Sequence, residues 1–375
     1  MAAVDLHDNR RAHAMQIMKN AQAWQDMAQE FELIAPGRWS RPPLDPQRLA
    51  AFYGLTRPLP VVSYPLAALE RHPWPWLNTL FYRLAARRAA RRKVNLIYTR
   101  SYAMAGQAIA RGLPTVVETH GPPDDDPRKA ELYRHLHHPL LRALVTISQP
   151  LKERYLAHGL PEAKILVTPD GVDLERFAQP LSLREARQHL GLNQERPLAV
   201  YSGHLYAGRG VETILAAARL LPGVDFLFVG GFDADVARYR ALAGDIPNVR
   251  FTGFVDNALL PPWLWAADCL LMPYGRDCPT MAWMSPLKMF EYLAAGRPLI
   301  ASDLPVLGEV LRQHDNALLV AVDDAQALAA GVRWVCEHPD AARDLGRRAA
   351  ACAPDYGWDR RVRRILDFIG VTWAQ

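Results

Sequence analysis

The sequence CLLMPYGRDCPTMAWMSPLKMFEYLAAGRPLIASD, residues 269–303, combines two strand patterns with a helical pattern between them. The runs Cys269–Tyr274 and Pro298–Asp303 are almost continuously apolar, which is typical of strands covered by helices on both faces. Between them, Ser285 is suited to the N-cap of a helix and Pro286 to its first position. This strand–helix–strand order predicts a parallel sheet.

The same alternation extends over most of the chain. Further strands are expected at Phe31–Pro36, Asn95–Arg100, Thr115–His120, Leu144–Ser148, Ile165–Asp170, Leu198–Gly203, Asp225–Gly231, Val249–Val255 and Ala317–Val322. Because so many strands exceed one core, the sequence predicts an α/β protein with two Rossmann-like, doubly wound parallel-sheet domains facing each other across a cleft. We expect an N-terminal domain at residues 1–178, a linker at 179–196 and a C-terminal domain at 197–355. Met1–Asn9 shows no strand pattern, so the first strand is expected to be short or missing.

The composition excludes several classes of protein. Half of the 375 residues are apolar and 22% are charged, which suits folded domains rather than disorder. The four cysteines form no Cys-x-x-Cys pair, which argues against a disulfide scaffold and most structural zinc sites. Without a long apolar run or a secretory signal, we expect a cytoplasmic protein. Residues 1–180 carry a net charge of +7 and the rest −2, which indicates an anionic neighbour of the first half.

The loop Ser202–Gly210 follows an apolar strand pattern and opens a helix. Its glycines allow a ligand to approach the backbone, Arg209 offers a phosphate a permanently charged fork, and His204 could add a second donor. The glycine spacing is close to that of a P-loop. However, Arg209 and Gly210 stand where Lys and Ser/Thr are required, which excludes an NTPase of that class. An ordinary turn with a surface arginine is the alternative.

The helix expected after Ser285 offers a second anion site. Its first N–H groups, at Leu287 and Lys288, and its dipole attract negative charge. Glu291 lies one turn further on and can accept hydrogen bonds from two ribose hydroxyls. A capped helix with a solvated glutamate is the alternative.

These two loops resemble the second domain of the retaining glycosyltransferases of the GT4 family, which have the GT-B fold. The glycine and basic positions of the family fall on Gly203, His204, Leu205, Arg209 and Gly210, with His204 and Arg209 replacing an arginine and a lysine. Residues 168–173 with Phe177, 251–255 and 285–303 also look like family segments, in the family's order. Tyr356-Gly357-Trp358 resembles the start of its last helix, so residues 356–375 are expected to cross back to the N-terminal domain.

The resemblance implies a role for particular residues. The donor would be bound by Gly203, His204, Arg209, Phe254, Val255, Ser285, Pro286, Leu287, Lys288 and Glu291, with Phe254 and Val255 at the base and Glu291 at the ribose. His120 would contact the transferred sugar, although a histidine that caps the backbone is the alternative. Arg10, Arg11 and His13 would face the acceptor. Trp283 stands where the family's first glutamate contacts the transferred sugar.

The resemblance implies neither a metal nor a cofactor. Asp124-Asp125-Asp126 suggests the metal-binding Asp-x-Asp of the other glycosyltransferase fold. It precedes a helix expected from about Pro127, where acidic residues favour the helix start. We therefore predict that basic residues and helix dipoles, rather than a metal, hold the diphosphate.

Residues 74–93 combine an apolar and a basic helical stripe. The apolar stripe is Leu77, Leu80, Phe81 and Leu84, and the basic one is Arg83, Arg87 and Arg91. This composition is typical of an interfacial helix on anionic lipid. A core-facing helix with a solvated basic face is the alternative. Nucleic acid is not expected, because no aromatic residues are interleaved with the basic ones.

The sequence thus predicts a metal-independent, retaining glycosyltransferase that moves a sugar from a nucleoside-diphosphate sugar to a hydroxyl acceptor. It would act in the cytoplasm, with the inner face of the membrane as a candidate surface. A non-catalytic sugar-nucleotide-binding or scaffold protein on the same fold is the main alternative, suggested by Trp283 and the missing first strand. A sugar-nucleotide epimerase is the second. The sequence leaves the base, the sugar and the acceptor open.

Overall fold

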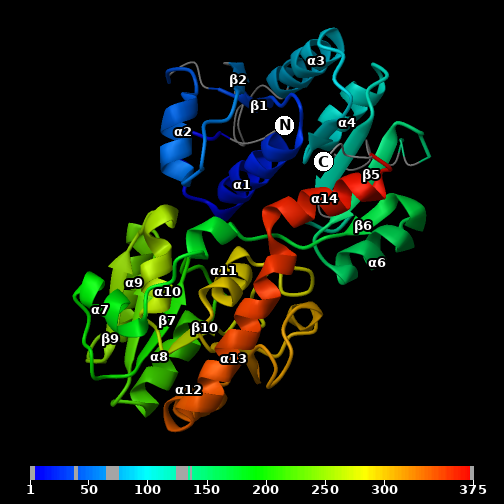
Figure 1. Cartoon of the computed structure of the whole chain (residues 1–375). Helices are drawn as coiled ribbons and strands as arrows, with labels where there is room; N and C mark the ends of the chain where they lie inside the picture. Colours follow the sequence, from blue (N-terminus) through cyan, green and yellow to red (C-terminus); the bar gives the residue numbers. More distant parts are fainter. Residues whose placement is uncertain (1–4, 38–40, 65–75, 124–133, 136, 372–375) are drawn as a thin grey trace. The chain divides into compact units, whose positions relative to one another are not determined.

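The computed structural model describes residues 5–37, 41–64, 76–123, 134–135 and 137–371 (Figure 1). The chain forms two compact units. The first contains Met1–Asp170 and Trp358–Gln375, and the second contains Gly171–Gly357. All strand pairs among the described residues are parallel. The predicted Asp124-Asp125-Asp126 segment lies outside the described residues, and so does the start of the helix expected from Pro127.

The second unit is built on one six-stranded sheet. Its strands are β7 (Leu198–Ser202), β8 (Asp225–Val229), β9 (Val249–Gly253), β10 (Cys269–Met272), β11 (Leu299–Ser302) and β12 (Leu318–Val320), in the order β12-β11-β10-β7-β8-β9. Its helices are α7 (Leu183–Leu190), α8 (Val211–Leu220), α9 (Asp233–Ala243), α10 (Leu260–Trp265), α11 (Leu287–Ala295), α12 (Ala325–Glu337) and α13 (Pro339–Cys352). Chain order reverses between β7 and β10. Ligands of such sheets bind at the carboxyl ends of the strands beside this reversal.

Helices cover both faces of this sheet. Neighbouring residues of a strand point to opposite faces, so Val200 and Leu270 pack in the core that includes α10 and α11. Tyr201 and Leu271 pack in the other core, with residues of α8 and α12. The continuous apolar runs of the sequence follow from this two-sided burial.

The predicted linker at 179–196 is wrong, because this segment belongs to the second unit. Helix α7 begins with a capping box between Ser182 and Glu185. Arg187 of this helix is buried, donates to the Ala266 carbonyl at 3.0 Å and pairs with Asp268. Polar composition suggested a joint between domains, but these polar side chains hold the helix onto its own unit.

The first unit contains two separate sheets. Strands β1 (Leu33–Pro36) and β2 (Val61–Tyr64) form one sheet, and β3 (Ile97–Thr99), β4 (Thr115–Thr119), β5 (Leu141–Thr146) and β6 (Ile165–Val167) form the other in chain order. Its helices are α1 (Ala12–Met27), α2 (Pro46–Tyr53), α3 (Trp76–Arg91), α4 (Tyr102–Ile109), α6 (Gln149–Ala157) and α14 (Trp358–Phe368). Residues 5–11 form turns rather than a strand. Helix α14 packs on α1 within this unit.

Short 3₁₀ turns join several elements. They are Glu162–Lys164, Leu174–Phe177, Asn257–Leu259, Leu307–Glu309 and Ala353–Tyr356. No helix built from the described residues has both the length and the apolar character that a membrane span requires.

Candidate functional site

Two loops meet at the point where the strand order of the second unit reverses. The loop after β7 contains Gly208 and Gly210, both with positive φ. A Cβ added at Gly210 would lie 1.7 Å from the Pro273 carbonyl oxygen, and one at Gly208 would lie 2.4 Å from the Cys278 nitrogen. The loop after β10 packs directly against the backbone of Gly208 and Gly210. Because any side chain would prevent this packing, both positions require glycine.

Arg209 and Lys288 bring two positive charges to this junction. The Arg209 guanidinium lies 5.0 Å from the centre of the Tyr274 ring, and Lys288 Nζ lies 3.7 Å from the centre of the Tyr201 ring. A Cβ at Gly203 would lie 3.1 Å from Lys288 Nζ. The structure therefore brings together the two segments that the sequence assigns to the diphosphate. It also adds Tyr201 and Tyr274, which sequence reasoning missed.

The electrostatics of this junction favour an anion. Burial lowers the pKa of Lys288 well below its usual range, and the nearby charge of Arg209 lowers it further. Among the described residues, no carboxylate lies within ion-pair distance of either side chain. Aromatic ring faces instead provide part of the stabilisation. A bound phosphate would compensate both charges.

Helix α11 begins one residue later than the sequence predicts. Pro286 is the N-cap, with φ −78° and ψ 125°, and the first helical residue is Leu287. Ser285 is buried and lies ahead of the cap, so its predicted N-cap position is wrong. The first N–H groups of α11 are still those of Leu287 and Lys288.

Glu291 is held by two donors that sequence reasoning missed. Its Oε1 accepts from Arg176 Nη1 at 3.2 Å and from Asn257 Nδ2 at 3.1 Å. Arg176 also donates to the Asn257 carbonyl. Arg176 lies just before Phe177, in a segment that the sequence already singled out, so its charge was an available signal. These contacts fix the carboxylate predicted to meet the ribose.

The remaining predicted donor residues lie around the same end of the sheet. The His204 ring stacks on Phe232 and Tyr206, with ring centres 4.5 and 5.0 Å away. Phe254 and Val255 follow β9 and are half-buried. Trp283 is half-buried in the turn before α11, where its backbone N–H donates to the Thr280 carbonyl at 3.0 Å. Their contacts with a donor stay predictions.

His120 lies at the end of β4 in the first unit. Its Nε2 lies 2.6 Å from Glu118 Oε1, and its side chain is 21% exposed, whereas that of Glu118 is fully buried. The capping alternative for His120 placed its ring on the backbone, but its recorded partner is a carboxylate. Residues two apart on a strand share a face, so the Glu-x-His spacing could have predicted this pair.

Glu118 is surrounded by donors. Arg361 of α14 pairs with its Oε2 at 2.8 Å, Gln16 of α1 donates to Oε1 at 2.7 Å, and the Tyr98 hydroxyl donates to Oε2. Burial alone would raise the pKa of Glu118, but the charge of Arg361 and the hydrogen bond with His120 lower it to about 2. The carboxylate is therefore ionised at neutral pH.

Glu118, His120 and Asp170 also have the composition of a cation site, with ligand atoms within 4.8 Å of one another. Arg361 already pairs with one oxygen of Glu118, and His120 bonds the other. Arg100 Nε lies 4.0 Å from Glu118 Oε1 and adds positive charge. This set of donors fits an internal ion-pair network rather than a metal.

Two family descriptions match the chain along most of its length. Residues 196–338 match the glycosyl transferases group 1, and residues 15–176 match glycosyltransferase family 4. The chain belongs to the family 4 glycosyltransferases. The parallel sheets of the two units and the likeness to solved glycosyltransferase structures agree with the predicted GT-B fold.

This family 4 chain is similar to several bacterial proteins. It is 31% identical to the phosphatidyl-myo-inositol mannosyltransferase of Mycolicibacterium smegmatis over 51% of this chain and 47% of that protein. It is 25% identical to the putative glycosyltransferase EpsD of Bacillus subtilis over 87% and 82% of the two chains. The chain thus spans about half the length of the mannosyltransferase.

Solved structures show the same fold. HepE of Anabaena, crystallised with UDP, has a TM-score of 0.73 and 16% identity, and the match covers 98% of both chains. A glycosyltransferase from Rickettsia africae has a TM-score of 0.73 and 14% identity, over 94% of this chain and 93% of that one.

The predicted acceptor-side residues of this family 4 protein lie at the start of α1. Arg10 and Arg11 are exposed, and His13 is half-buried in the first turn. Arg11 is the N-cap, and Asn9 Oδ1 accepts from the Arg11 N–H at 3.1 Å. Asn9 is therefore not the N-cap. Nothing in these contacts identifies an acceptor.

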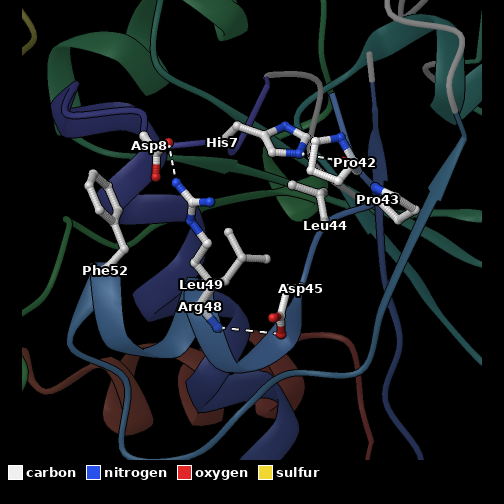
Figure 2. A pocket seen from close by; sticks show the side chains of 9 residues that line it. All are labelled: His7, Asp8, Pro42, Pro43, Leu44, Asp45, Arg48, Leu49 and Phe52. Atoms are coloured by element: carbon white, nitrogen blue, oxygen red, sulfur yellow. Dashed lines mark hydrogen bonds and ion pairs between the residues drawn. The ribbon is translucent and has the colours of Figure 1, made fainter. Parts of the chain in front are cut away.

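A pocket of about 180 Å³ lies beside this segment, between residues 7–8, residues 42–45 and α2 (Figure 2). Its polar groups contact one another: Arg48 pairs with Asp8 at 2.8 Å, and His7 Nε2 lies 3.0 Å from the Pro42 carbonyl oxygen. Asp45 accepts the N–H of Gln47 at 2.8 Å as the N-cap of α2. The pocket therefore supports local packing and adds no reactive group.

Helix α3 separates the two alternatives for residues 74–93, although residues 74 and 75 lie outside the described residues. Phe81 is buried with Ala85 and Ala89 in a core shared with β1 and α4. Arg83, Arg87 and Arg91 are exposed. Of the apolar stripe, Phe81 is buried, Leu77 and Leu84 are half-buried and Leu80 is 36% exposed. The helix is thus anchored to the core through part of this stripe, while the basic stripe remains available to an anionic surface.

Proposed function

We propose that this chain transfers a sugar from a nucleoside-diphosphate sugar to a hydroxyl acceptor, with retention and without a metal. The observation that carries the proposal is the half-buried pair Arg209 and Lys288, held at the reversal point of the second sheet beside the first turn of α11. Two like charges at this junction repel each other, and a bound anion of higher charge would relieve that repulsion. A diphosphate meets this requirement.

The same two cations supply the catalytic electrostatics. When the bond between the sugar and the diphosphate breaks, negative charge grows on the leaving phosphate oxygen. Fixed positive groups stabilise that charge without reorganisation. The acceptor oxygen then bonds the anomeric carbon on the face from which the diphosphate leaves, and the departing phosphate takes the acceptor proton. His120 is proposed to contact the transferred sugar.

The ribose is proposed to bind Glu291. Arg176 and Asn257 hold one oxygen of this carboxylate, which limits its motion before the nucleotide arrives. Preorganisation of this kind lowers the entropy lost on binding. Because two cations already face the diphosphate position, we propose that no divalent ion is required. Activity in EDTA should equal that in Mg²⁺, and dependence on Mg²⁺ would contradict this part.

A thermal-shift screen of UDP-, GDP- and ADP-sugars tests the proposal. A ligand that binds only the native state raises the melting temperature, and the rise grows with the logarithm of its concentration relative to its dissociation constant. UDP and UDP-glucose are the first probes, because the similar HepE structures contain them. At least one sugar nucleotide should shift the melting point, and Arg209→Ala should reduce that shift at the same ligand concentration. The absence of any shift would contradict the donor site.

A non-catalytic binding protein is favoured by one observation, the tryptophan at position 283. The family resemblance implies a glutamate there that contacts the transferred sugar. Turnover separates the two functions: release of nucleoside diphosphate, by transfer or by slow hydrolysis, supports the enzyme. Binding of the donor without any release supports the alternative. Conversion of the sugar nucleotide without an acceptor would indicate an epimerase.

A further inference from the structure

The buried carboxylate of Glu118 has a feature that the proposed function does not explain. A fully buried glutamate is rare, and this one is contacted by α1, β3 and α14 as well as by its own strand. Such a network is built at a cost in desolvation. His120, whose side chain is 21% exposed, is one of its partly exposed members.

We propose that Glu118 is a positioning residue that fixes the ring orientation and tautomer of His120, so that Nε2 carries the proton and Nδ1 is left to receive a hydrogen bond from a sugar hydroxyl. The inference rests on the proposed function, in which His120 contacts the transferred sugar. Glu118 does not itself touch substrate in this scheme. It acts only through the imidazole.

The hydrogen-bond chemistry determines the tautomer. An ionised carboxylate can only accept, so the 2.6 Å contact requires a proton on His120 Nε2. In the neutral ring Nδ1 is then an acceptor. The hydrogen bond of one imidazole nitrogen thus sets what the other can offer, as in metal and triad sites.

The surrounding residues prevent Glu118 from moving away. Gln16 holds Oε1 at 2.7 Å, and Arg100 Nη1 in turn donates to Gln16 Oε1 at 2.9 Å. Arg361 pairs with Oε2 at 2.8 Å while its Nε donates to the Pro169 carbonyl at 2.8 Å. The carboxylate is therefore fixed from two sides.

The strand geometry keeps this network apart from the opposite face of β4. Thr119, between Glu118 and His120, points away and lies 2.6 Å from the Tyr102 hydroxyl and 3.0 Å from that of Tyr155. The alternation of the strand thus separates a hydroxyl cluster that secures β4 from the carboxylate–imidazole pair.

The first test is the tautomer of His120 in the unmodified protein. Long-range ¹H–¹⁵N spectra of histidine-labelled protein, assigned by the signal lost in His120→Ala, should show the proton on Nε2. A proton on Nδ1, or exchange between both tautomers, would overturn the proposal. This measurement needs no turnover, so it stands even if no donor or acceptor is found and the proposed function fails.

The second test is a double-mutant cycle on transfer or donor hydrolysis. Glu118→Gln and His120→Ala should each lower kcat/KM by about 10- to 100-fold, the range for residues that orient an imidazole. The double variant should be no worse than His120→Ala, because Glu118 acts through that ring. Multiplied losses would indicate a separate structural role and overturn the proposal.

Two controls separate positioning from unfolding. Glu32→Gln removes another carboxylate of the same unit, one that pairs with Arg88 at 2.7 Å, and should leave kcat/KM unchanged. UDP affinity of Glu118→Gln should stay within about twofold, because the donor residues lie in the other unit. If Glu118→Gln unfolds, the spectra of the unmodified protein still decide the proposal.

The charged groups that face the Glu118–His120 pair are Arg100, Asp170 and Arg361. None of these three residues is substituted in Glu118→Gln or in His120→Ala.

Discussion

Two charge clusters, one in each unit, differ in how their charges are compensated. In the first unit, Glu118 is matched by Arg361 and His120, so this buried network is complete without any ligand. In the second unit, Arg209 and Lys288 lie against tyrosine rings. The difference teaches that the charge of one cluster is compensated within the protein, whereas the other cluster is arranged for an anion that arrives from solution.

The largest expected effect tests the compensated cluster. Arg361→Leu leaves Glu118 buried without its guanidinium and should lower the free energy of unfolding by about 3–5 kcal/mol. Urea unfolding followed by circular dichroism measures this change. Arg343→Leu is the matched control, because Arg343 forms an exposed pair with Asp340 and should change stability by less than about 1 kcal/mol. Equal effects of the two variants would remove the distinction between the clusters.

Arg209→Ala tests the cluster of the second unit. It should weaken binding of the nucleoside diphosphate by about 1.5–3 kcal/mol, the scale of a charged hydrogen bond, without destabilising the unliganded protein. Loss of a neighbouring like charge explains the second expectation. Calorimetry measures the affinity, and Arg219→Ala, an exposed arginine of α8, serves as the control. Unchanged affinity in the folded Arg209 variant contradicts the phosphate role.

Acid pH should affect the first cluster. The pKa of Glu118 is lowered from 4.5 to about 2, so folding favours the ionised form. The stability that this carboxylate contributes is complete above about pH 4.5 and is lost as the pH falls toward about 2. Unfolding free energies measured across this range should fall less steeply in Glu118→Gln. An unchanged slope would mean that the carboxylate is not the group that titrates.

The second cluster should also make stability depend on pH, in the same direction but through Lys288 and at higher pH. The pKa of Lys288 is lowered, so the unfolded chain binds more protons, and the stability of the unliganded protein rises with pH between the lowered and the ordinary pKa. A bound diphosphate favours protonated Lys288. Binding in this range should therefore take up a proton, which calorimetry in buffers of different ionisation enthalpy detects. Lys288→Met should bind without this uptake, and persistence of the uptake would assign it to another group.

The smallest expected effect concerns the exposed stripe of α3. Arg83, Arg87 and Arg91 should each add about 1 kcal/mol to binding of anionic vesicles at low salt. Sedimentation with phosphatidylserine vesicles, compared with neutral ones, measures it, and charge removal at all three positions should abolish the difference. Equal binding to both kinds of vesicle would show that the basic charge of the first unit has another purpose.

The errors of sequence reasoning have particular causes. Leu144–Ser148 was expected as a strand, but β5 begins at Leu141, because the exposed Arg142 interrupts the apolar pattern without interrupting the strand. Strand β2 was missed because its four residues are only half-buried and follow prolines. The linker was misplaced because the polar residues of α7 are engaged by their own unit.

The sequence by itself determined the parallel α/β class, the glycine loop at 203–210 and the helix start near Lys288. These depend on apolar periodicity, on backbone freedom and on capping, which act between residues close in the chain. Only the tertiary structure decided the partners of the site residues. Glu291 meets Arg176 from 115 positions away, and Glu118 meets Arg361 of the last helix. Such pairs depend on which surfaces the packed sheets and helices bring together, and no local pattern encodes that choice.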